Sequence, residues 1–484
     1  MDNNFKFIEA FRTFRDLELR FDLFTQTING VYFWDYLRFK IWHEILTEAG
    51  LMQTTHSRVN DFLGWISRIS ELISLIWNSI FMNPFQFRER EFLFIGAGVS
   101  RKKKLENGRL EDIWCDPLID HLGRDRSILL EEPLMGKHGF FHHTEHLGST
   151  SSIKLSSACA FFLKRVSSHD LTLEESSFLE EVDSFISKTF AIPSLNLKKS
   201  VLDLLHKHSV VQPKIIKLFK SVRPKAIFIV CSYVGREIYI EAAQALSIPV
   251  IELQHGSINP YHVGYSYDRG SYKSLFPDYF LSFGRFWEEA VQLPIESKNV
   301  MTMGFPYLDR KLSTTKKTKK KQVLFISQWT IGKELSEFAV KLNQNLPPDW
   351  NLIFKLHPKE FLDWKKYYGK LANSNINVIS DDSSSLYDLL GESAIQIGVY
   401  STALFEGLAL GCQTYIVELS GCVNMESLAK SGLCDFVKDP SEILFQVGTD
   451  DSCVNKDYFF ADNWRPNLDK ALKKWLKLDR KQST

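Results

Sequence analysis

Histidine and hydroxyl side chains follow three predicted strands of this chain, at positions where they could bind phosphate or move protons. The first group is Gln254-His255-Gly256-Ser257, directly after a buried apolar run. Histidine has an ordinary pKa near ~6.5, so His255 can take the proton of a hydroxyl group at neutral pH and act as a general base. The following loop adds His262, which could line the same cleft. The alternative is a structural histidine that bonds nearby backbone.

The second group is Lys355-Leu356-His357-Pro358, at the end of the apolar run NLIFK. Pro358 has no N–H group, so it ends the strand ladder and leaves His357 at the tip of the turn. The imidazole of His357 could bond a phosphate oxygen, and Lys355 could add positive charge. Packing alone would explain a strand-end histidine equally well.

The third group is Ser401 and Thr402, with Glu406 one turn later, where a predicted strand passes into a helix. Hydroxyl groups and the unsatisfied N–H groups of a helix N-terminus bind anions, and the helix dipole strengthens this binding. Glu406 lies in an otherwise apolar helix, where a carboxylate is costly to bury without a partner, and it could bind ribose hydroxyl groups. An ordinary N-cap serine is the simpler alternative.

Three further segments resemble known sites but lack part of the pattern. Residues 96–98, GAG, begin like the dinucleotide fingerprint GxGxxG, but the third glycine is missing. Residues 142–146, HHTEH, match the letters of a zinc peptidase motif, but they lie in a predicted loop between glycines rather than in a helix. Asp381-Asp382 is typical of helix capping. We therefore predict no metal site, and the sequence contains no P-loop motif.

The elements that must position these groups alternate between short apolar runs and helical stretches. The first series of predicted strands lies at 91–100, 126–133, 226–233, 248–256, 278–284 and 300–306, and the second at 322–328, 351–358, 376–380, 394–401 and 412–419. This alternation predicts parallel sheets, and ligands bind beyond the carboxyl ends of their strands. The predicted fold class is therefore α/β, with two Rossmann-like doubly wound domains that face a central cleft.

The two series divide the chain into five parts. We predict a helical N-terminal segment at 1–90, a first Rossmann-like domain at 91–308, a basic linker at 309–321, a second Rossmann-like domain at 322–465 and a C-terminal helix or tail at 466–484. The lysine run at 316–321 is typical of a solvated linker, with contact to an anionic membrane or acceptor as the alternative. The apolar helix predicted at 63–81 either covers the domain core or lies on a membrane or partner. We expect the tail helix to cross back to the first domain.

The composition excludes several classes of protein. The 484 residues are 44% hydrophobic and 24% charged, which indicates a globular chain of two or three domains. The net charge of +1 lacks the basic excess of a dedicated nucleic-acid-binding protein. Seven scattered cysteines without a CxxC pair indicate reduced thiols. We expect no secretory signal and no membrane-spanning helix, and therefore a cytoplasmic protein.

Taken together, the strand-ending HG at 255–256, the strand-ending HP at 357–358 and the ST…E helix start at 401–406 resemble the GT-B glycosyltransferases. The resemblance is to bacterial capsule, O-antigen and teichoic-acid enzymes of the polysialyltransferase, Kdo-transferase and CDP-glycerol glycerophosphotransferase groups, and it covers residues 91–465. HP followed by ST…E is moderately specific, whereas HG is common to many sheets. The polyol-phosphate transferases tend to carry Trp before HG, where this chain has Gln254.

This resemblance implies a glycosyltransferase without cofactor or metal that moves a sugar from a nucleotide donor to a hydroxyl group of a cell-surface glycan or lipid-linked acceptor, with inversion. It implies that His255 is the catalytic base, that the HP motif with Ser401 and Thr402 binds the donor phosphate, and that Glu406 binds the ribose. Peripheral contact with the inner face of the cell membrane would follow from a lipid-linked acceptor. The alternatives are a CDP-polyol phosphotransferase, a sugar-nucleotide epimerase and a non-catalytic scaffold that binds a nucleotide sugar.

Overall fold

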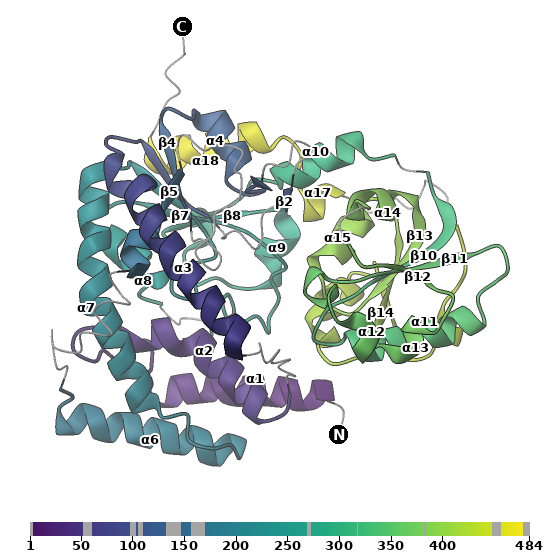
Figure 1. Ribbon diagram of the computed structural model, residues 1–484, viewed down its shortest axis with the longest axis horizontal. Helices are drawn as coiled ribbons and strands as arrows, with labels where there is room; N and C mark the ends of the chain where they lie inside the picture. Colours follow the sequence, from purple (N-terminus) through teal and green to yellow (C-terminus); the bar gives the residue numbers. More distant parts are fainter. Residues whose placement is uncertain are drawn as a thin grey trace, which may run out of the picture.

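The chain forms two α/β domains that lie side by side (Figure 1). The computed structural model describes residues 3–51, 61–96, 103–104, 110–131, 147–155, 170–268, 273–316, 318–381, 384–447 and 456–477. Each domain is built around one parallel sheet with helices between its strands.

The sheet of the first domain has seven strands in the order β5-β4-β1-β6-β7-β8-β9. These are β1 (Phe92–Ile95), β4 (Ser127–Glu131), β5 (Leu147–Ser149), β6 (Ala226–Val230), β7 (Val250–Leu253), β8 (Tyr279–Ser282) and β9 (Val300–Thr302). All neighbours pair in parallel. β1 and β6 are apolar and buried along their whole length, as expected for central strands covered on both faces. A separate antiparallel pair joins β2 (Lys103–Lys104) to β3 (Leu110–Glu111).

The sheet of the second domain has six parallel strands in the order β12-β11-β10-β13-β14-β15. These are β10 (Lys320–Ile326), β11 (Asn351–Lys355), β12 (Asn377–Ile379), β13 (Ser393–Gly398), β14 (Gln413–Val417) and β15 (Asp435–Val437). The run VLFI of β10 is buried between its two neighbours, which fixes the centre of this sheet.

In both sheets the strand order reverses beside the first strand. β1 lies between β4 and β6, and β10 lies between β11 and β13. This is the order of a doubly wound sheet, whose ligands bind outside the carboxyl ends of the strands at the point of reversal. The structure therefore confirms the predicted α/β fold of two Rossmann-like domains.

Helices connect the strands of both sheets. In the first domain they are α4 (Asp116–Leu122), α6 (Leu173–Phe190), α7 (Leu197–Val222), α8 (Glu237–Gln244), α9 (Arg285–Ala290) and α10 (Pro306–Thr314). In the second they are α11 (Gly332–Gln344), α12 (Trp364–Tyr367), α13 (Gly369–Ala372), α14 (Leu386–Glu392), α15 (Thr402–Ala409) and α16 (Glu426–Lys430). α6 begins with a capping box, in which Thr172 and Glu175 each accept the other's backbone N–H.

The N-terminal helices α1 (Asn3–Arg20) and α2 (Phe33–Glu48) belong to the first domain. Phe14 and Trp34 are fully buried in one cluster with Leu179 of α6 and Val201 of α7. In the interior of this bundle the Arg38 guanidinium of α2 is paired with the carboxylate of Glu18 on α1. Its Nη2 donates to Glu18 Oε2 at 2.9 Å. A buried charge is tolerated because it is paired.

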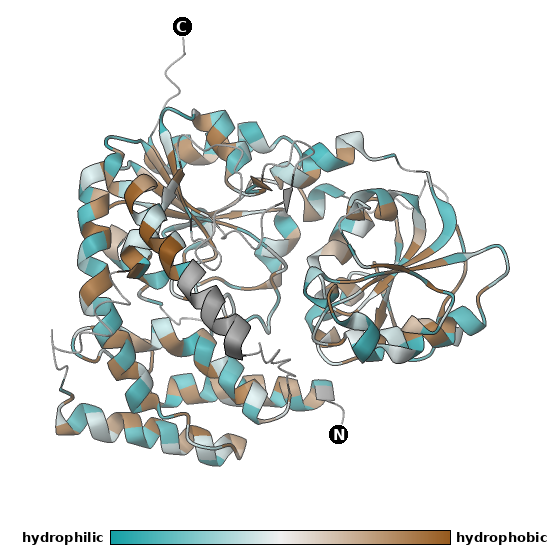
Figure 2. Ribbon diagram, viewed as in Figure 1, coloured by the Kyte–Doolittle hydropathy of each residue, from teal (hydrophilic) through white to brown (hydrophobic). Residues whose placement is uncertain are grey.

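Helix α3 (Asp61–Phe81) presents apolar side chains to the outside of the molecule. Ile73, Trp77 and Phe81, at helical spacing, are 62%, 62% and 58% exposed, whereas Asn78 is buried. Figure 2 shows the brown residues of the C-terminal half of α3 on the front of the first domain. The exposed side chains of this stripe do not cover the domain core, which was the first of the two predicted alternatives.

The segment predicted as a basic linker is largely folded, because α10 and β10 occupy most of it. Lys319 Nζ donates to the carbonyl oxygens of Leu390 and Ser393 at 2.8 and 2.7 Å. Lys320 pairs with Glu392 at 2.7 Å. The C-terminal end of α14 supplies these acceptors, and cations are stabilised at such an end. Lys319 and Lys320 are therefore bound to the second domain and are not part of a solvated linker.

The chain returns to the first domain through α17 (Lys456–Phe459) and α18 (Trp464–Leu476). Trp475 stacks on Tyr279 of β8 with ring centroids 4.5 Å apart, and Asp469 contacts His121 of α4 at 2.8 Å. The indole of Trp287 in α9 donates to the carbonyl of the last α17 residue at 2.7 Å. The last residue of α17, Phe459, contacts both Trp287 of α9 in the first domain and Phe405 of α15 in the second, so α17 lies between the two domains just before the boundary predicted at residue 465.

Two further observations concern the described residues alone. The five cysteines among them are buried and form no disulfide. No helix in the described ranges is both long enough and apolar enough to cross a membrane.

Candidate active site

The carboxyl ends of the two sheets meet at one contact. The N–H group of Ser257, after β7, donates to Oγ1 of Thr402, at the start of α15, at 3.1 Å. A Cβ atom added to Gly256 would stand 3.6 Å from the same hydroxyl oxygen. The fold therefore brings together two of the predicted motifs that are 145 residues apart in the sequence.

His255 lies half-buried between the hydroxyl groups of two tyrosines. Its Nε2 atom is 3.2 Å from the Tyr233 hydroxyl, and its Nδ1 atom is 3.1 Å from the Tyr265 hydroxyl. Tyr233 follows β6 and Tyr265 belongs to the loop after β7, so the pairing of these two strands brings both tyrosines to the histidine. Burial raises the pKa of Tyr265 well above its ordinary value, which keeps it a neutral phenol. Both ring nitrogens of His255 thus take part in a polar network of side chains.

A buried carboxylate stands behind this network. Glu252, within β7, is fully buried, and its Oε1 accepts from the Tyr265 hydroxyl at 2.6 Å and from the Ser232 N–H at 3.1 Å. Burial raises the pKa of Glu252 to about 7, although these two hydrogen bonds and the charge of Lys273 lower it. One strand therefore carries both the histidine at its end and a carboxylate three residues earlier.

His262 joins the same network. Its Nε2 atom lies 3.2 Å from the Tyr233 hydroxyl, and its Nδ1 atom accepts from the Gly264 N–H at 3.2 Å. The predicted second histidine is therefore brought next to His255, with one tyrosine hydroxyl between the two rings.

Gln254 has a different role from the predicted one. It is 1% exposed, its Oε1 accepts from the Phe283 N–H at 2.7 Å, and its Nε2 donates to the Gly256 carbonyl at 2.8 Å. Both ends of the amide are thus used in the interior. Gln254 fastens the end of β7 to the end of β8 and does not line a cleft.

Glu360 holds the HP turn of the second domain. Pro358 begins a single 3₁₀ turn (Pro358–Glu360), and the His357 N–H before it donates to Glu360 Oε2 at 2.6 Å. Ser327, after β10, donates to Glu360 Oε1 at 3.0 Å. His357 Nδ1 accepts from the Lys359 N–H at 3.2 Å, so the neutral ring carries its proton on Nε2. The turn thus holds the Nε2–H group of His357 in a fixed position beside the end of β10.

Gln328 spans the point of strand-order reversal in the second sheet. Its Oε1 accepts from the Tyr400 N–H at 2.9 Å, and its Nε2 donates to the Tyr400 carbonyl. Gln328 follows β10 and Tyr400 follows β13, so this pair joins the two loops between which ligands of such sheets bind. Ser401 comes next and is the N-cap of α15, with its hydroxyl accepting from the Ala403 N–H at 3.3 Å.

Lys355 does not join this group. Its Nζ donates to the Asp381 carbonyl at 2.7 Å and lies 5.1 Å from the centre of the Phe361 ring. Asp381 follows β12, which lies on the far side of β11 from β10 and β13. The position of Lys355 therefore does not support the predicted phosphate contact, because its ammonium group is directed toward the edge of the sheet.

Glu406 has the partner that a buried carboxylate needs. It is 8% exposed and hydrogen-bonds Tyr387, whose pKa is raised well above its ordinary value by burial and by this carboxylate. The ring of Tyr387 lies 5.8 Å from that of Tyr307, which belongs to α10 of the first domain. Glu406 therefore sits close to the boundary between the domains.

The helix that carries Thr402 and Glu406 packs directly on the first domain. The ring of Phe405 lies 4.5 Å from Trp287 of α9 and 5.7 Å from Phe459 of α17. This apolar contact positions the N-terminus of α15 against the first domain.

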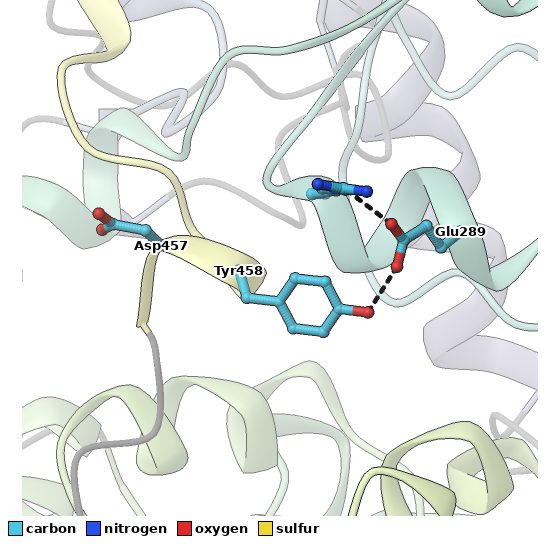
Figure 3. Close-up of a pocket in the computed structure, with 4 residues that line it drawn as sticks. Glu289, Asp457 and Tyr458 are labelled. Carbon is cyan, nitrogen blue, oxygen red and sulfur yellow. Dashed lines mark hydrogen bonds and ion pairs between the residues drawn. The ribbon is translucent and has the colours of Figure 1, made fainter.

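A cavity of about 420 Å³ opens between α9 and α17, lined by Arg285, Glu289, Asp457 and Tyr458. Figure 3 shows Tyr458 pointing at Glu289, which accepts from the Tyr458 hydroxyl at 2.6 Å and from Arg285 Nε at 2.7 Å. These two hydrogen bonds lower the pKa of Glu289. The cavity contains none of the predicted site residues and is a separate feature of the first domain.

Some of the sequence motifs lie outside the described residues, namely 97–98, 142–146 and Asp382. Within the described ranges, no group of three or more His, Cys, Asp or Glu side chains could hold a metal ion.

Sequence reasoning missed four residues that organise the site, Tyr233, Glu252, Gln328 and Glu360. Of these, Glu252 carried a signal in the sequence, because an acidic residue inside the apolar run IPVIEL must have a partner if the strand is buried. The other three are ordinary polar residues after strands or turns.

No protein-family model and no curated protein matches the chain. Among solved structures, the UDP-GlcNAc 2-epimerase of Methanocaldococcus jannaschii is 12% identical, with 78% of this chain and 98% of that chain covered and a TM-score of 0.46. The UDP-GlcNAc 2-epimerase of Neisseria meningitidis bound to UDP-GlcNAc is 13% identical, with 79% and 99% covered and a TM-score of 0.44. The spinosyn rhamnosyltransferase SpnG is 11% identical, with 80% and 93% covered and a TM-score of 0.38. At these values the assignment of the fold rests on the strand order of the two sheets.

Proposed function

We propose that this protein is a glycosyltransferase that moves a sugar from a nucleotide-activated donor to a hydroxyl group of a glycan or lipid-linked glycan acceptor. The observation that carries the proposal is the 3.1 Å contact between Ser257 and Thr402, beside which His255 and the N-terminus of α15 stand on opposite domains. Displacement at an anomeric carbon needs a proton acceptor on one side and stabilisation of a leaving phosphate on the other.

The proposed reaction is a single displacement. His255 takes the proton of the acceptor hydroxyl, and the acceptor oxygen forms a bond to the anomeric carbon. The bond from that carbon to the phosphate oxygen breaks, and its electron pair leaves with the phosphate. The N–H groups of α15, the hydroxyls of Ser401 and Thr402, and the Nε2–H group of His357 stabilise the negative charge. Attack opposite the leaving group inverts the configuration, and the reaction requires no cofactor.

Glu406, held by Tyr387, accepts hydrogen bonds from the ribose of the donor in this proposal. A lipid-linked acceptor would bring the protein from the cytoplasm to the inner face of the cell membrane. The acceptor domain then contributes the base, and the second domain contributes the donor site.

A panel of UDP, CMP, CDP, GDP and dTDP, each added to the wild type and to His357→Ala, tests the donor site by thermal unfolding. We expect one nucleotide to stabilise the wild type, by about 2.7 kcal/mol at a concentration of about 100 times its Kd. The stabilisation should fall by more than half in His357→Ala, because the variant lacks the Nε2–H donor, and should be kept in His206→Ala, on α7. No stabilisation by any nucleotide, or equal stabilisation in His357→Ala, would contradict the proposed site.

The nucleotide identified in this way then separates the alternatives. Wild-type protein is incubated with the corresponding nucleotide sugar, with and without hydroxyl acceptors. A glycosylated acceptor supports the proposal. Turnover of the nucleotide sugar without acceptor would instead indicate an epimerase, and phosphorus in the product would indicate a polyol phosphotransferase. Binding without any turnover would indicate a scaffold.

A further inference from the structure

The contacts around His255 form a chain of hydrogen bonds that ends on a buried carboxylate. The Tyr265 hydroxyl has one proton, which it donates to Glu252 Oε1 at 2.6 Å. Its oxygen therefore accepts from His255 Nδ1, 3.1 Å away. The Ser232 N–H donates to the same Glu252 oxygen at 3.1 Å, so the carboxylate accepts from both sides. These hydrogen bonds from Glu252 to His255 place the proton of the neutral His255 ring on Nδ1.

The other end of this series of hydrogen bonds is consistent with the same assignment. The Gly264 backbone N–H can only donate, so His262 Nδ1 is an acceptor and the neutral His262 ring carries its proton on Nε2. His262 Nε2 then donates to the Tyr233 oxygen, 3.2 Å away. The Tyr233 hydroxyl can then donate its own proton to His255 Nε2, also 3.2 Å away. All donors point in one direction, from the backbone N–H group to the carboxylate.

We propose that Tyr265 and Glu252 are positioning residues that hold His255 with its proton on Nδ1 and its lone pair on Nε2, and that stabilise the charged ring formed when Nε2 accepts a substrate proton. This inference rests on the proposed function, in which His255 is the base. In that step the acceptor hydroxyl takes the place of the Tyr233 hydroxyl at Nε2. The acceptor O–H bond breaks and an N–H bond forms. The positive charge on the ring then faces Glu252 across the Tyr265 hydroxyl, and the other protons stay where they were.

The ionisable groups that face this chain set the pH range in which it acts. Tyr233 and His262 stand on the Nε2 side of His255, and Tyr265 stands on the Nδ1 side. Glu252 is influenced in addition by Lys273, whose charge lowers the pKa of this carboxyl group against the larger effect of burial. With a pKa of about 7, Glu252 is mostly ionised above that pH, and there it favours the charged form of His255.

Two variants separate orientation from charge. Tyr265→Phe removes the acceptor at His255 Nδ1, whereas Glu252→Gln keeps an acceptor oxygen for Tyr265 and removes only the charge. Tyr267→Phe is the matched control, since this buried hydroxyl lies in the same loop and donates to the Gly264 carbonyl at 3.3 Å. The measurement is the ring ¹⁵N chemical shift of His255 as a function of pH, in full-length protein labelled on histidine. It reports both the protonated nitrogen and the pKa of the ring.

In the wild type we expect the proton on Nδ1. Tyr265→Phe should mix the two neutral forms and lower the pKa of His255, and Glu252→Gln should lower the pKa without changing the protonated nitrogen. In both variants kcat/KM for transfer should fall at least about tenfold, a part of the ~100-fold or more that a general base contributes. The acid limb of the kcat/KM profile should move to lower pH. An unchanged tautomer and pKa in Tyr265→Phe, equal to those of Tyr267→Phe, would overturn the proposal.

His255→Ala distinguishes a failure of this inference from a failure of the proposed function. A wild-type rate of transfer in His255→Ala would overturn the role of the base and this inference with it. Loss of transfer in His255→Ala together with unchanged ring shifts in Tyr265→Phe would overturn the positioning role alone. If Tyr265→Phe does not fold by circular dichroism, the pKa of His255 in Glu252→Gln decides, and an unchanged value there would overturn the proposal.

Discussion

The charge of one buried cation, Lys273, acts on three buried acids of the first domain. Burial raises the pKa of Glu237, at the start of α8, and of Glu252 to about 7, and that of Asp35, in α2, to about 6. In each case the charge of Lys273 lowers the pKa. Burial outweighs this charge in each case, and for Asp35 it also outweighs the charge of Arg38, so these residues retain protons at a pH where exposed acids have lost them.

Glu237→Gln tests this consequence. The folded protein binds the Glu237 proton more tightly than the unfolded chain, whose ordinary pKa is 4.5, so the stability that this proton contributes is lost as the pH rises from there to about 7. We expect the variant to gain stability relative to the wild type over this range, by at most about 3 kcal/mol. Urea unfolding at pH 5 and pH 8 measures the gain.

The control for this prediction is Glu174→Gln, on the exposed surface of α6. Its difference in free energy of unfolding from the wild type should be the same at both pH values. A pH trend in Glu174→Gln as large as that in Glu237→Gln would show that the buried acid is not its source.

At this scale the sequence identified the residues that end strands but not the residues that connect them. The sequence pattern could identify His255, Ser257 and Thr402, because each follows an apolar run. Tyr233 was not, because its bond to His255 exists only through the pairing of β6 with β7, which no local pattern states. Lys355 was predicted correctly at the end of a strand, which is β11. The direction of its side chain could not be predicted, because it depends on which strands lie on either side of β11 in the sheet.

Among the elements, α3 has its apolar face turned outward. Ile73, Trp77 and Phe81 follow one another at spacings of four residues, so they form one stripe, and Asn78 on the other face is buried. Exposed apolar stripes with Trp and Phe are typical of helices that lie in the interface of a membrane.

Replacing Ile73, Trp77 and Phe81 with serine therefore should lower the fraction of protein that sediments with vesicles of anionic phospholipid. Because these side chains are already exposed, the melting temperature should change little. Leu173→Ser is the matched control, since this leucine of α6 is 92% exposed but stands apart from the stripe. Equal sedimentation of the two variants would contradict a membrane role for α3.

The apolar runs predicted eleven strands, all of which are present. The central ones, such as β1 and β6, are buried on both faces and therefore need a continuous apolar sequence. β5 and β15 were not predicted. Each has three residues, as β9 and β12 also have, but the strand sequences LGS and DFV contain a glycine or an aspartate and stand outside any longer apolar run. The basic run at 316–321 was interpreted as a linker because its lysines are polar, although β10 continues into it.

For the molecule as a whole, the N-terminal helix is also a clasp between the domains. Asn4, on α1, donates to the Leu419 carbonyl at 3.2 Å and accepts from the Gly421 N–H at 2.9 Å. These residues follow β14 in the second domain. Together with the packing of Phe405 on Trp287, this pair of hydrogen bonds holds the arrangement in which Ser257 reaches Thr402.

We expect Asn4→Ala to weaken this arrangement by about 2 kcal/mol, the size of two ordinary hydrogen bonds. Small-angle X-ray scattering should then give a larger radius of gyration than the wild type. Asn343→Ala is the control, because its amide donates to Asn375 within the second domain at 2.7 Å. If the scattering curves of Asn4→Ala and Asn343→Ala coincide, α1 does not hold the domains together.

The order of the elements along the chain has a consequence for biosynthesis. Helices α1 to α10 precede the second domain and α17 and α18 follow it, so the second domain is inserted into the first. On the ribosome the inserted sheet is complete before α17 and α18 exist. Until they are made, the surfaces of Tyr279 and Trp287 that they cover remain open to water. A premature stop before α18 would therefore disrupt the first domain, although most of it is encoded earlier. The second domain, which is encoded just before the stop, would stay intact.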